Sequence, residues 1–309
     1  MTVLVGVDAG GSHTEVVVCC GTDLQLRRRG QFAAITAGSV TDSAATIAGL
    51  IGDVLLESKL NERAGAIVVG AAGAGRSEER DALERSLASR LSYDVALHVT
   101  TDGAIALESA FPNKMPGMLL ISGTGSVAFA RDTRGRIFRT GGLGWQLGDE
   151  GSGYSLGRAA LGAVGRAAEN RGPGTLLSER IAAATASNSV AALVGWAATA
   201  DTTSVAALAR EVLIAAGECD AVAVELVADA ARKLVDHVRV LVSKFPSDAP
   251  PPELALSGGL LHQDSLLRAE LVELLASTLP GVRLSLTTVD PAMGAVSLAA
   301  ALVRHSEPG

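Results

Sequence analysis

The stretch VLVGVDAGGSHT (residues 3–14) places an apolar, β-branched run directly before a turn of small residues. Residues 3–7 predict a buried strand, and the β-branched run at residues 15–20 predicts a second strand after the turn. Taken alone, this pattern is typical of an ordinary β-hairpin as well as of a loop that binds a ligand.

The turn itself carries groups that can bind a phosphate. Gly10 and Gly11 have no Cβ atom, so the backbone N–H groups here can approach phosphate oxygens closely. Ser12 and Thr14 add hydroxyl donors, and Asp8 at the strand end is placed to hold Mg²⁺ through water. The sequence has no G-x-x-x-x-G-K-[ST] pattern, so this is not a P-loop of the Walker type.

A similar unit opens the second part of the chain. Residues 119–125 (LLISGTG) form an apolar run that ends in a small polar turn, and another β-branched run follows at residues 127–130. Gly123, Thr124 and Gly125 repeat the combination of glycine backbone and hydroxyl. Two such turns can hold a triphosphate from two sides, so the repeat indicates a duplicated architecture with a cleft between the halves.

The remaining pattern predicts an α/β fold with a mixed sheet flanked by helices. Further strands are expected at residues 66–69, 95–99, 118–122, 254–257 and 284–287. Helices are expected at residues 43–60, 78–91, 154–168, 175–184, 204–216 and 221–244. The proline-containing segment FPNKMPG predicts a boundary between an N-terminal domain at residues 1–113 and a larger domain at residues 114–291, with a helix at residues 292–309 packing back on the first.

The segment GGLGWQLGDEGSG (residues 141–153) has six glycines around two adjacent carboxylates. That density predicts an irregular loop whose backbone approaches a ligand. Asp149 can accept hydrogen bonds from sugar hydroxyls, and Glu150 can do the same or cap the helix that follows. The alternative is that either carboxylate is only a helix N-cap.

Two shorter motifs lie at strand ends. Asp102 in TTDGA follows the strand predicted at residues 95–99, where an Asp is often an N-cap but where catalytic groups also collect. A carboxylate there could accept the proton of an attacking hydroxyl. In LSGG, Gly258 and Gly259 form a turn that allows flat contact with a planar base.

Composition narrows the class of partner. The 309 residues carry a formal net charge of −7, which argues against nucleic acid or an anionic membrane as the main partner. The basic run Arg27-Arg28-Arg29 is interpreted as solvated surface. Cys19, Cys20 and Cys219 show no C-x-x-C spacing, so no disulfide framework, zinc site or Fe–S site is expected, and the first two are expected to be buried thiols.

The N-terminal residues lack the basic and apolar regions of a signal peptide, and no apolar run reaches the roughly 18–20 residues that span a bilayer. We therefore expect a cytoplasmic protein.

Taken together, DAGGSHT, TTDGA, ISGTGS, GGLGWQLGDEGSGY and LSGG resemble the motifs of the N-acetylglucosamine kinase and BadF/BadG-type ATPase family. That family belongs to the actin/hexokinase/Hsp70 ATPase superfamily, so the resemblance implies the ribonuclease-H-like, actin-like ATPase fold. It extends over essentially the whole chain, from Asp8 to Gly259.

The resemblance also implies a role for each matching residue. Asp102 would be the general base, and Mg²⁺ would bridge the phosphates near Asp8. ATP would contact Gly10, Gly11, Ser12, Thr14, Gly123, Thr124, Gly125, Gly258 and Gly259. A sugar would contact Ser126, Val127, Gly142, Leu143, Gly144, Asp149 and Glu150.

Two departures affect the sugar pocket. Ala34 stands where the family's sugar kinases carry an Asn, with Thr36 as the nearest polar substitute, and Leu143 stands where an aromatic residue is usual. Losing a hydrogen-bonding group changes which substrate a site accepts. The resemblance therefore implies an amino-sugar or related hexose kinase, most plainly in its phosphate-binding motifs.

Two other functions stay open. One is an ATPase that drives a partner protein, although the three cysteines are not where such activators hold an Fe–S cluster. The other is a sugar-sensing regulator without turnover, against which Asp102 argues. The family resemblance also implies a homodimer.

Overall fold

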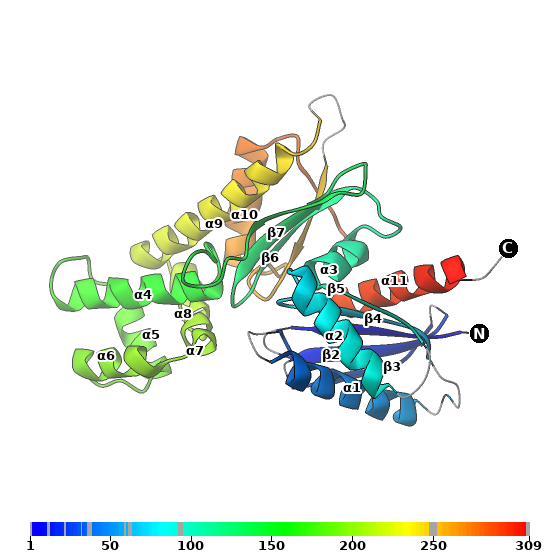
Figure 1. Cartoon of the computed structure of the whole chain (residues 1–309). Coiled ribbons are helices and arrows are strands. Elements are labelled where there is room, and N and C mark those ends of the chain that lie inside the picture. Colours follow the sequence, from blue (N-terminus) through cyan, green and yellow to red (C-terminus); the bar gives the residue numbers. More distant parts are fainter. Residues whose placement is uncertain are drawn as a thin grey trace. The chain divides into compact units, whose positions relative to one another are not determined.

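The computed structural model describes residues 2–10, 13–21, 23–31, 33–35, 39–58, 60, 64–91, 95–246 and 252–306. The chain forms two compact units. Unit 1 comprises Met1–Pro116 and Thr287–Gly309, and unit 2 comprises Gly117–Leu286. Figure 1 shows the red C-terminal helix packed with the blue and cyan elements of unit 1, to which it belongs.

Unit 1 contains a five-stranded mixed sheet in the order β3-β2-β1-β4-β5. Its strands are β1 (Val3–Ala9), β2 (Thr14–Cys20), β3 (Asp23–Gly30), β4 (Ala64–Ala71) and β5 (Ala96–Thr101). β1 pairs antiparallel with β2 and parallel with β4, and β4 pairs parallel with β5. Asp8 therefore lies beside Glu15 of β2 on one side and Gly70 of β4 on the other.

Helices cover both faces of this sheet (Figure 1). They are α1 (Val40–Glu57), α2 (Ser77–Arg90), α3 (Asp102–Ala110) and α11 (Pro291–Ser306). Successive residues of β1 enter opposite cores, since Val5 packs with α1 and α2 whereas Leu4 packs with α3 and α11. This is the two-residue period of a strand that is buried on both faces.

Glycine lets α11 pack closely within unit 1. A Cβ at Gly6 would lie 2.2 Å from the carbonyl oxygen of Ala292, and one at Gly294 would lie 1.9 Å from that of Ile105. The absence of side chains at these two positions lets the backbones of β1, α3 and α11 come together.

Unit 2 repeats the strand connections of unit 1. Its sheet has the order β10-β9-β6-β7-β8. The strands are β6 (Gly117–Ser122), β7 (Ser126–Arg131), β8 (Ile137–Gly141), β9 (Glu253–Ser257) and β10 (Arg283–Leu284). An antiparallel meander is followed by two parallel strands in both sheets, which confirms the internal repeat that the two Gly-rich turns predicted.

The helices of unit 2 form a core of their own with this sheet. They are α4 (Gly153–Ala168), α5 (Leu177–Ala184), α6 (Val190–Thr199), α7 (Thr202–Ala207), α8 (Ala209–Gly217), α9 (Ala221–Val242) and α10 (Leu266–Thr278). Leu120 of β6, Leu156 of α4 and Leu234 of α9 belong to this core. Figure 1 shows α4 to α8 as a helical region beside α9.

The structure confirms the interpretation of the basic run as surface for Arg28 and Arg29, which are exposed, whereas Arg27 is partly buried. The run lies inside β3, and Arg27 forms ion pairs with Glu15 at 2.6 Å and with Asp290 at 2.5 Å. Arg28 pairs with Glu57, and Arg29 pairs with Glu15. The sequence did not indicate this edge strand, because most of its residues are exposed and three of them are consecutive arginines.

Smaller differences concern element ends and thiols. The strand expected at residues 284–287 is only Arg283–Leu284, and Gly141 is the last residue of β8 rather than part of a loop. Cys19 is buried as expected, but Cys20 is only partly buried. Within the described ranges, no helix has the length and apolar character needed to cross a membrane.

We predict that Gly294→Ala destabilises unit 1, because the new methyl group would overlap the Ile105 carbonyl. Overpacking of this kind costs about 1–3 kcal/mol of unfolding free energy. Thermal and urea unfolding would measure the loss. Gly52→Ala on α1, where nothing lies within 4 Å of the added Cβ, is the control. It should stabilise by about 0.4–1 kcal/mol, and equal effects of the two variants would contradict the packing argument.

Candidate active site

Four carboxylates influence one another where β1 of unit 1 ends. Burial, and after it the negative charges of Asp102, Glu15 and Asp290, together raise the pKa of Asp8 to about 7. The pKa of a carboxyl group rises when its charged form is removed from water and lies near other negative charges.

Two of the four charges are compensated. Arg27 bridges Glu15 and Asp290, and Asp290 also caps α11 by accepting a hydrogen bond from Met293 N at 3.2 Å. By contrast, neither Asp8 nor Asp102 has an ion pair within the part of the chain that the structure describes. The site therefore has an excess of negative charge that a bound cation would neutralise.

Asp102 is the first residue of α3, directly after β5. The helix cap is the neighbouring Thr101, whose Oγ1 accepts a hydrogen bond from Ala104 N at 3.1 Å. The alternative in which Asp102 is the N-cap is therefore wrong. Its Oδ1 accepts only from Gly103 N, at 2.8 Å, among the described residues.

The first Gly-rich turn is described in part. Gly10 N donates to His13 O at 3.0 Å, which closes the turn between β1 and β2. Thr14 is fully buried in β2, and its Oγ1 has no hydrogen-bond partner within the described ranges. Gly11, Ser12 and Thr36 lie outside the described residues, so their predicted contacts with ATP and sugar stay predictions.

The second Gly-rich turn joins β6 to β7 and is tied to the start of α4. Gly153 N donates to Gly123 O at 2.8 Å, and Tyr154 N donates to Thr124 O at 3.1 Å. Gly123 N in turn donates to Gly125 O at 2.9 Å. These bonds fix the turn against the loop that precedes α4.

The turn after β9 meets the end of β6. Gly258 has φ +96°, and a Cβ there would lie 2.2 Å from the Ser122 carbonyl oxygen. That oxygen accepts a hydrogen bond from Leu260 N at 3.1 Å. Gly259 has open space at its Cβ position. Three predicted motifs, at residues 122–126, 141–153 and 256–260, therefore meet in unit 2.

Asp149 lies in the loop between β8 and α4 with a left-handed backbone, φ +60°, which is uncommon for a residue other than glycine. Ser126 N donates to its Oδ1 at 3.3 Å, and a Cβ at Gly125 would lie only 3.0 Å from the carboxylate. Burial raises the pKa of Asp149 despite the opposing hydrogen bond from Ser126. The carboxylate of Asp149 occupies space that is available only because residue 125 is a glycine.

Neither acidic residue of this loop caps α4. The cap is Ser152, whose Oγ accepts a hydrogen bond from Ser155 N at 3.1 Å. The capping role considered for Asp149 and Glu150 is therefore wrong. The backbone carbonyl of Glu150 accepts from Ser126 Oγ at 2.7 Å, and its Oε2 lies 3.7 Å from His237 Nε2 on α9.

The first half of the loop is open. Leu143 exposes 66% of its surface, between Gly142 at φ +65° and Gly144 at φ +82°. A Cβ at Gly142 would lie 2.9 Å from Cγ2 of Val127, so the loop backbone passes directly over β7.

Sequence reasoning missed several groups around this loop. Trp145 packs on Tyr154 with ring centroids 5.4 Å apart, and His237 lies beneath Gly141. The available signal was that Trp145 is one of only two tryptophans and falls within the Gly-rich motif. Asp290 and His237 carried no comparable signal, because single polar residues on helices or just before them are common.

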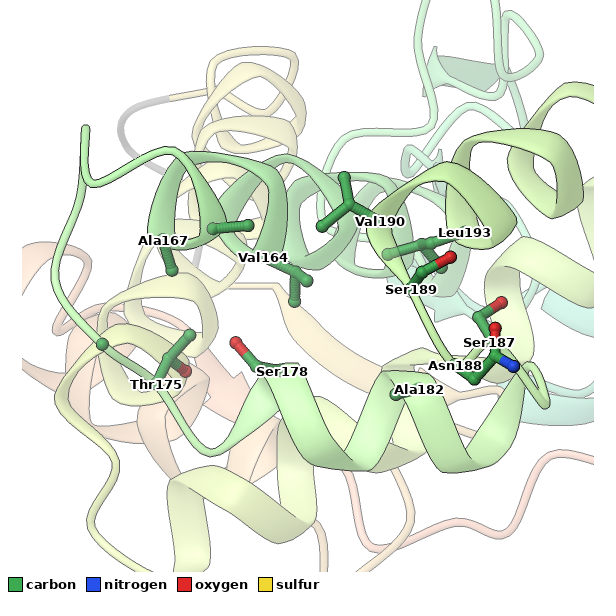
Figure 2. A pocket seen from close by; sticks show the side chains of 12 residues that line it. Val164, Ala167, Thr175, Ser178, Ala182, Ser187, Asn188, Ser189, Val190 and Leu193 are labelled. Atoms are coloured by element: carbon green, nitrogen blue, oxygen red, sulfur yellow. The ribbon is translucent and has the colours of Figure 1, made fainter.

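A separate cavity of about 550 Å³ lies among α4, α5 and α6. Figure 2 shows Val164, Ala167 and Val190 on one side and Ser178 and Ala182 on the other. None of its lining residues belongs to the five motifs.

The carboxylates of unit 1 fit Mg²⁺, which prefers oxygen ligands and keeps several waters. Within the described ranges, no group of three or more His, Cys, Asp or Glu side chains is arranged to hold a metal directly. Asp8, with its raised pKa and no paired cation, therefore fits a hydrated ion held through one carboxylate.

Two mixed sheets of matching strand order, each flanked by helices, define an α/β protein with the fold of actin-like ATPases and hexokinases. The chain belongs to the BadF/BadG/BcrA/BcrD ATPase family, whose model matches residues 5–299. This confirms the family resemblance of the five motifs.

Known relatives match nearly the whole chain. N-acetylmuramic acid/N-acetylglucosamine kinase of Clostridium acetobutylicum is 29% identical and covers 97% of this chain and 98% of its own. N-acetyl-D-glucosamine kinase of Dictyostelium discoideum is 24% identical, with 96% and 97% covered. The structure of a candidate N-acetylglucosamine kinase from Chromobacterium violaceum has a TM-score of 0.78 at 24% identity, with 98% and 99% covered.

The raised pKa of Asp8 predicts a pH dependence of stability in the metal-free protein. The folded state binds this proton more tightly than the unfolded state, whose carboxyl has a pKa of 3.8. The resulting stability is complete below about pH 4 and is lost as the pH rises through about 7. We expect the free energy of unfolding to fall between these values, and this fall to be reduced in Asp8→Asn.

Urea unfolding in EDTA across this range would measure the slope. Asp81→Asn, on an exposed position of α2, is the control and should keep the wild-type slope. Parallel pH profiles for wild type and Asp8→Asn would contradict the assignment.

Proposed function

We propose that this protein is an ATP-dependent kinase that transfers the γ-phosphoryl group of ATP to a hydroxyl of an amino sugar. The observation that carries the proposal is Asp102, a carboxylate at a strand end that neither caps its helix nor forms an ion pair within the described ranges. Such a group is free to accept a proton. Full-length similarity to two proteins named as amino-sugar kinases supports the substrate class.

Asp102 is the general base in this proposal. It accepts the proton of the sugar hydroxyl as that oxygen attacks the γ-phosphorus, and ADP leaves on the opposite side. Phosphoryl transfer depends mostly on positioning and on charge neutralisation rather than on covalent chemistry. A positioned base adds about 10²–10⁴-fold to the rate.

The nucleotide contacts in this proposal are those implied by the family resemblance of the Gly-rich motifs. Gly10, Gly123 and Gly125 would approach the phosphates, and Gly258 and Gly259 would border the adenosine. The buried Oγ1 of Thr14 supports a polar ligand beside the first turn. When bound at Asp8, Mg²⁺ would neutralise charge on the phosphate oxygens.

The sugar would be bound by the loop between β8 and α4. Asp149 is held by Ser126 N and by the space at Gly125, so its other oxygen can accept hydrogen bonds from sugar hydroxyls. The left-handed backbone of Asp149 is a strained feature of the kind that collects at functional sites.

We propose that the protein forms a homodimer, because helix α6 is uncharged and exposes apolar side chains. This helix has no charged residue, and only Leu193 is buried, whereas Val190 and Val194 are 47% and 64% exposed. A helix that is apolar all round is normally buried. A second copy offers an equally uncharged surface, and a two-fold axis would pair α6 and the cavity of Figure 2 with their equivalents. A cytoplasmic location stays a prediction from the sequence pattern.

Val194→Glu should disrupt this dimer. Two carboxylates would face each other across the axis, and like charges at an interface cost several kcal/mol, here about 3 kcal/mol or more. Sedimentation equilibrium would measure the association. Val240→Glu on α9, at 46% exposure, is the matched control and should leave the mass unchanged. A wild-type protein that is monomeric at high concentration would contradict the proposal.

The alternative is a family ATPase that drives a partner protein. The two functions can be distinguished by experiment, since ATP hydrolysis by such an ATPase would not depend on a sugar.

We predict that Asp102→Asn lowers kcat by about 10²–10⁴-fold. The KM for ATP should stay nearly unchanged, since the amide keeps the shape of the side chain. Coupled ADP release with Mg²⁺-ATP and a panel of amino sugars and glucose is the assay. Asp53→Asn, exposed on α1, is the control and should keep full activity. ATP turnover that no sugar changes would favour the protein-driving ATPase instead.

A further inference from the structure

A second cavity in unit 2, of about 400 Å³, lies between the Gly-rich loop and α4. Small-molecule sites typically occupy about 300–1,000 Å³. Its walls come from the loop, from one face of α4 and from α9. The residues that give it its chemistry are Trp145, Gly148, Tyr154, Arg158, Gly162 and Arg166.

One wall of this cavity is aromatic. The ring of Trp145 lies 5.4 Å from that of Tyr154 at an angle of 55°, and Trp145 is 46% exposed. A tryptophan that is half exposed but already packed on one side offers a rigid apolar face and an N–H donor. Such a wall suits the body of a ligand that has both apolar and polar groups.

A second part of the cavity wall carries positive charge. Arg158 and Arg166 line the cavity from α4, and in the described part of the chain neither guanidinium has a hydrogen-bond or ion-pair partner. Other arginines of unit 2 do have carboxylate partners, for example Arg180 with Glu211 and Glu218. Two unpaired guanidinium groups on one cavity wall fit an anion, because each can bind a carboxylate or phosphate with two parallel hydrogen bonds.

Glycine creates the space beneath Arg166. Nη1 of Arg166 lies 3.4 Å from the point where a Cβ at Gly162 would be, and nothing else lies within 4 Å of that point. The guanidinium therefore reaches back along α4 over the cavity. A longer side chain at residue 162 would fill the volume in front of it.

The cavity is lined by residues next to the segments that carry the proposed sugar site. Gly148 lines it, and the next residue is Asp149, whose Oδ1 accepts a hydrogen bond from Ser126 N. Tyr154 lines it too, and its backbone N–H donates to Thr124 O in the second Gly-rich turn. The loop that presents Asp149 and the turn that contacts it thus also supply or hold residues of the cavity wall, so we infer that a substituent of a sugar at Asp149 enters this cavity.

We propose that this cavity binds a carboxylate-bearing substituent of the amino sugar, with Trp145 against the substituent and Arg158 and Arg166 on the carboxylate. The proposal rests on the proposed function for the sugar at Asp149. It makes Arg158 and Arg166 specificity-determining residues that distinguish an acidic amino sugar from a neutral one, without a part in phosphoryl transfer.

The first test measures binding without turnover. With Trp196→Phe as background, Trp145 is the only tryptophan and reports occupancy of the cavity by its fluorescence. The probes are N-acetylmuramic acid, which carries a carboxylate, N-acetylglucosamine, which does not, and N-acetylglucosamine 6-phosphate. Arg158→Gln and Arg166→Gln should each weaken N-acetylmuramic acid binding by about 10–100-fold, as expected for a lost charge-assisted contact, and leave N-acetylglucosamine binding nearly unchanged.

Two further variants separate this effect from general damage. Arg210→Gln removes an exposed arginine of unit 2 that does not line the cavity, and it should change neither affinity. Gly162→Leu keeps both charges but fills the cavity, and it should weaken the acidic sugar selectively.

Equal affinity of wild type and both arginine variants for N-acetylmuramic acid would overturn the proposal. So would arginine-dependent binding of the 6-phosphate alone, which would mean that the cavity takes a phosphate. If the acidic sugar binds in an arginine-dependent way but no sugar is phosphorylated, the cavity assignment stands and the kinase proposal falls. In turnover, the variants should raise KM for the acidic sugar with little change in kcat.

Discussion

The partly buried carboxylate of Asp8 is the constraint on which unit 1 depends. Its position in the middle of the sheet places it beside Glu15 and within reach of the charges of Asp102 and Asp290, which together with burial raise its pKa to about 7. Arg27 compensates only two of these charges. A sheet that concentrates unpaired negative charge at one end is unfavourable by itself, and a bound divalent ion with its phosphate ligand would relieve that cost.

Unit 2 meets a different constraint, the close approach of backbones. Gly258 lies against the Ser122 carbonyl, Gly153 donates to Gly123, and Gly125 leaves room for the carboxylate of Asp149. Each of these contacts requires a missing side chain or a left-handed backbone. The three segments therefore form one rigid surface, and a side chain of defined orientation such as Asp149 can project from it. Preorganisation of this kind lowers the entropy that binding would otherwise cost.

The sequence predicted the α/β fold and the internal repeat because both depend on local patterns, namely β-branched runs and Gly-rich turns. It could not predict β3, because the contacts of Arg27 are with residues far along the chain. It could not decide whether Asp102 capped its helix, since Thr101 was an equally suitable cap. The cavity at Trp145 was also missed, because Trp145 comes from the Gly-rich loop whereas Tyr154 and the two arginines are spaced along α4. The predicted roles of the site residues stay predictions.

The central claim is that the γ-phosphoryl group of ATP reaches a sugar hydroxyl rather than water. Phosphorus-31 NMR of the protein with Mg²⁺-ATP and N-acetylglucosamine or N-acetylmuramic acid tests it most directly, because phosphate esters and inorganic phosphate have separate resonances. The account predicts a sugar phosphate ester that accumulates in equal amount to ADP. Accumulation of inorganic phosphate with ADP, and no ester with either sugar, would contradict it.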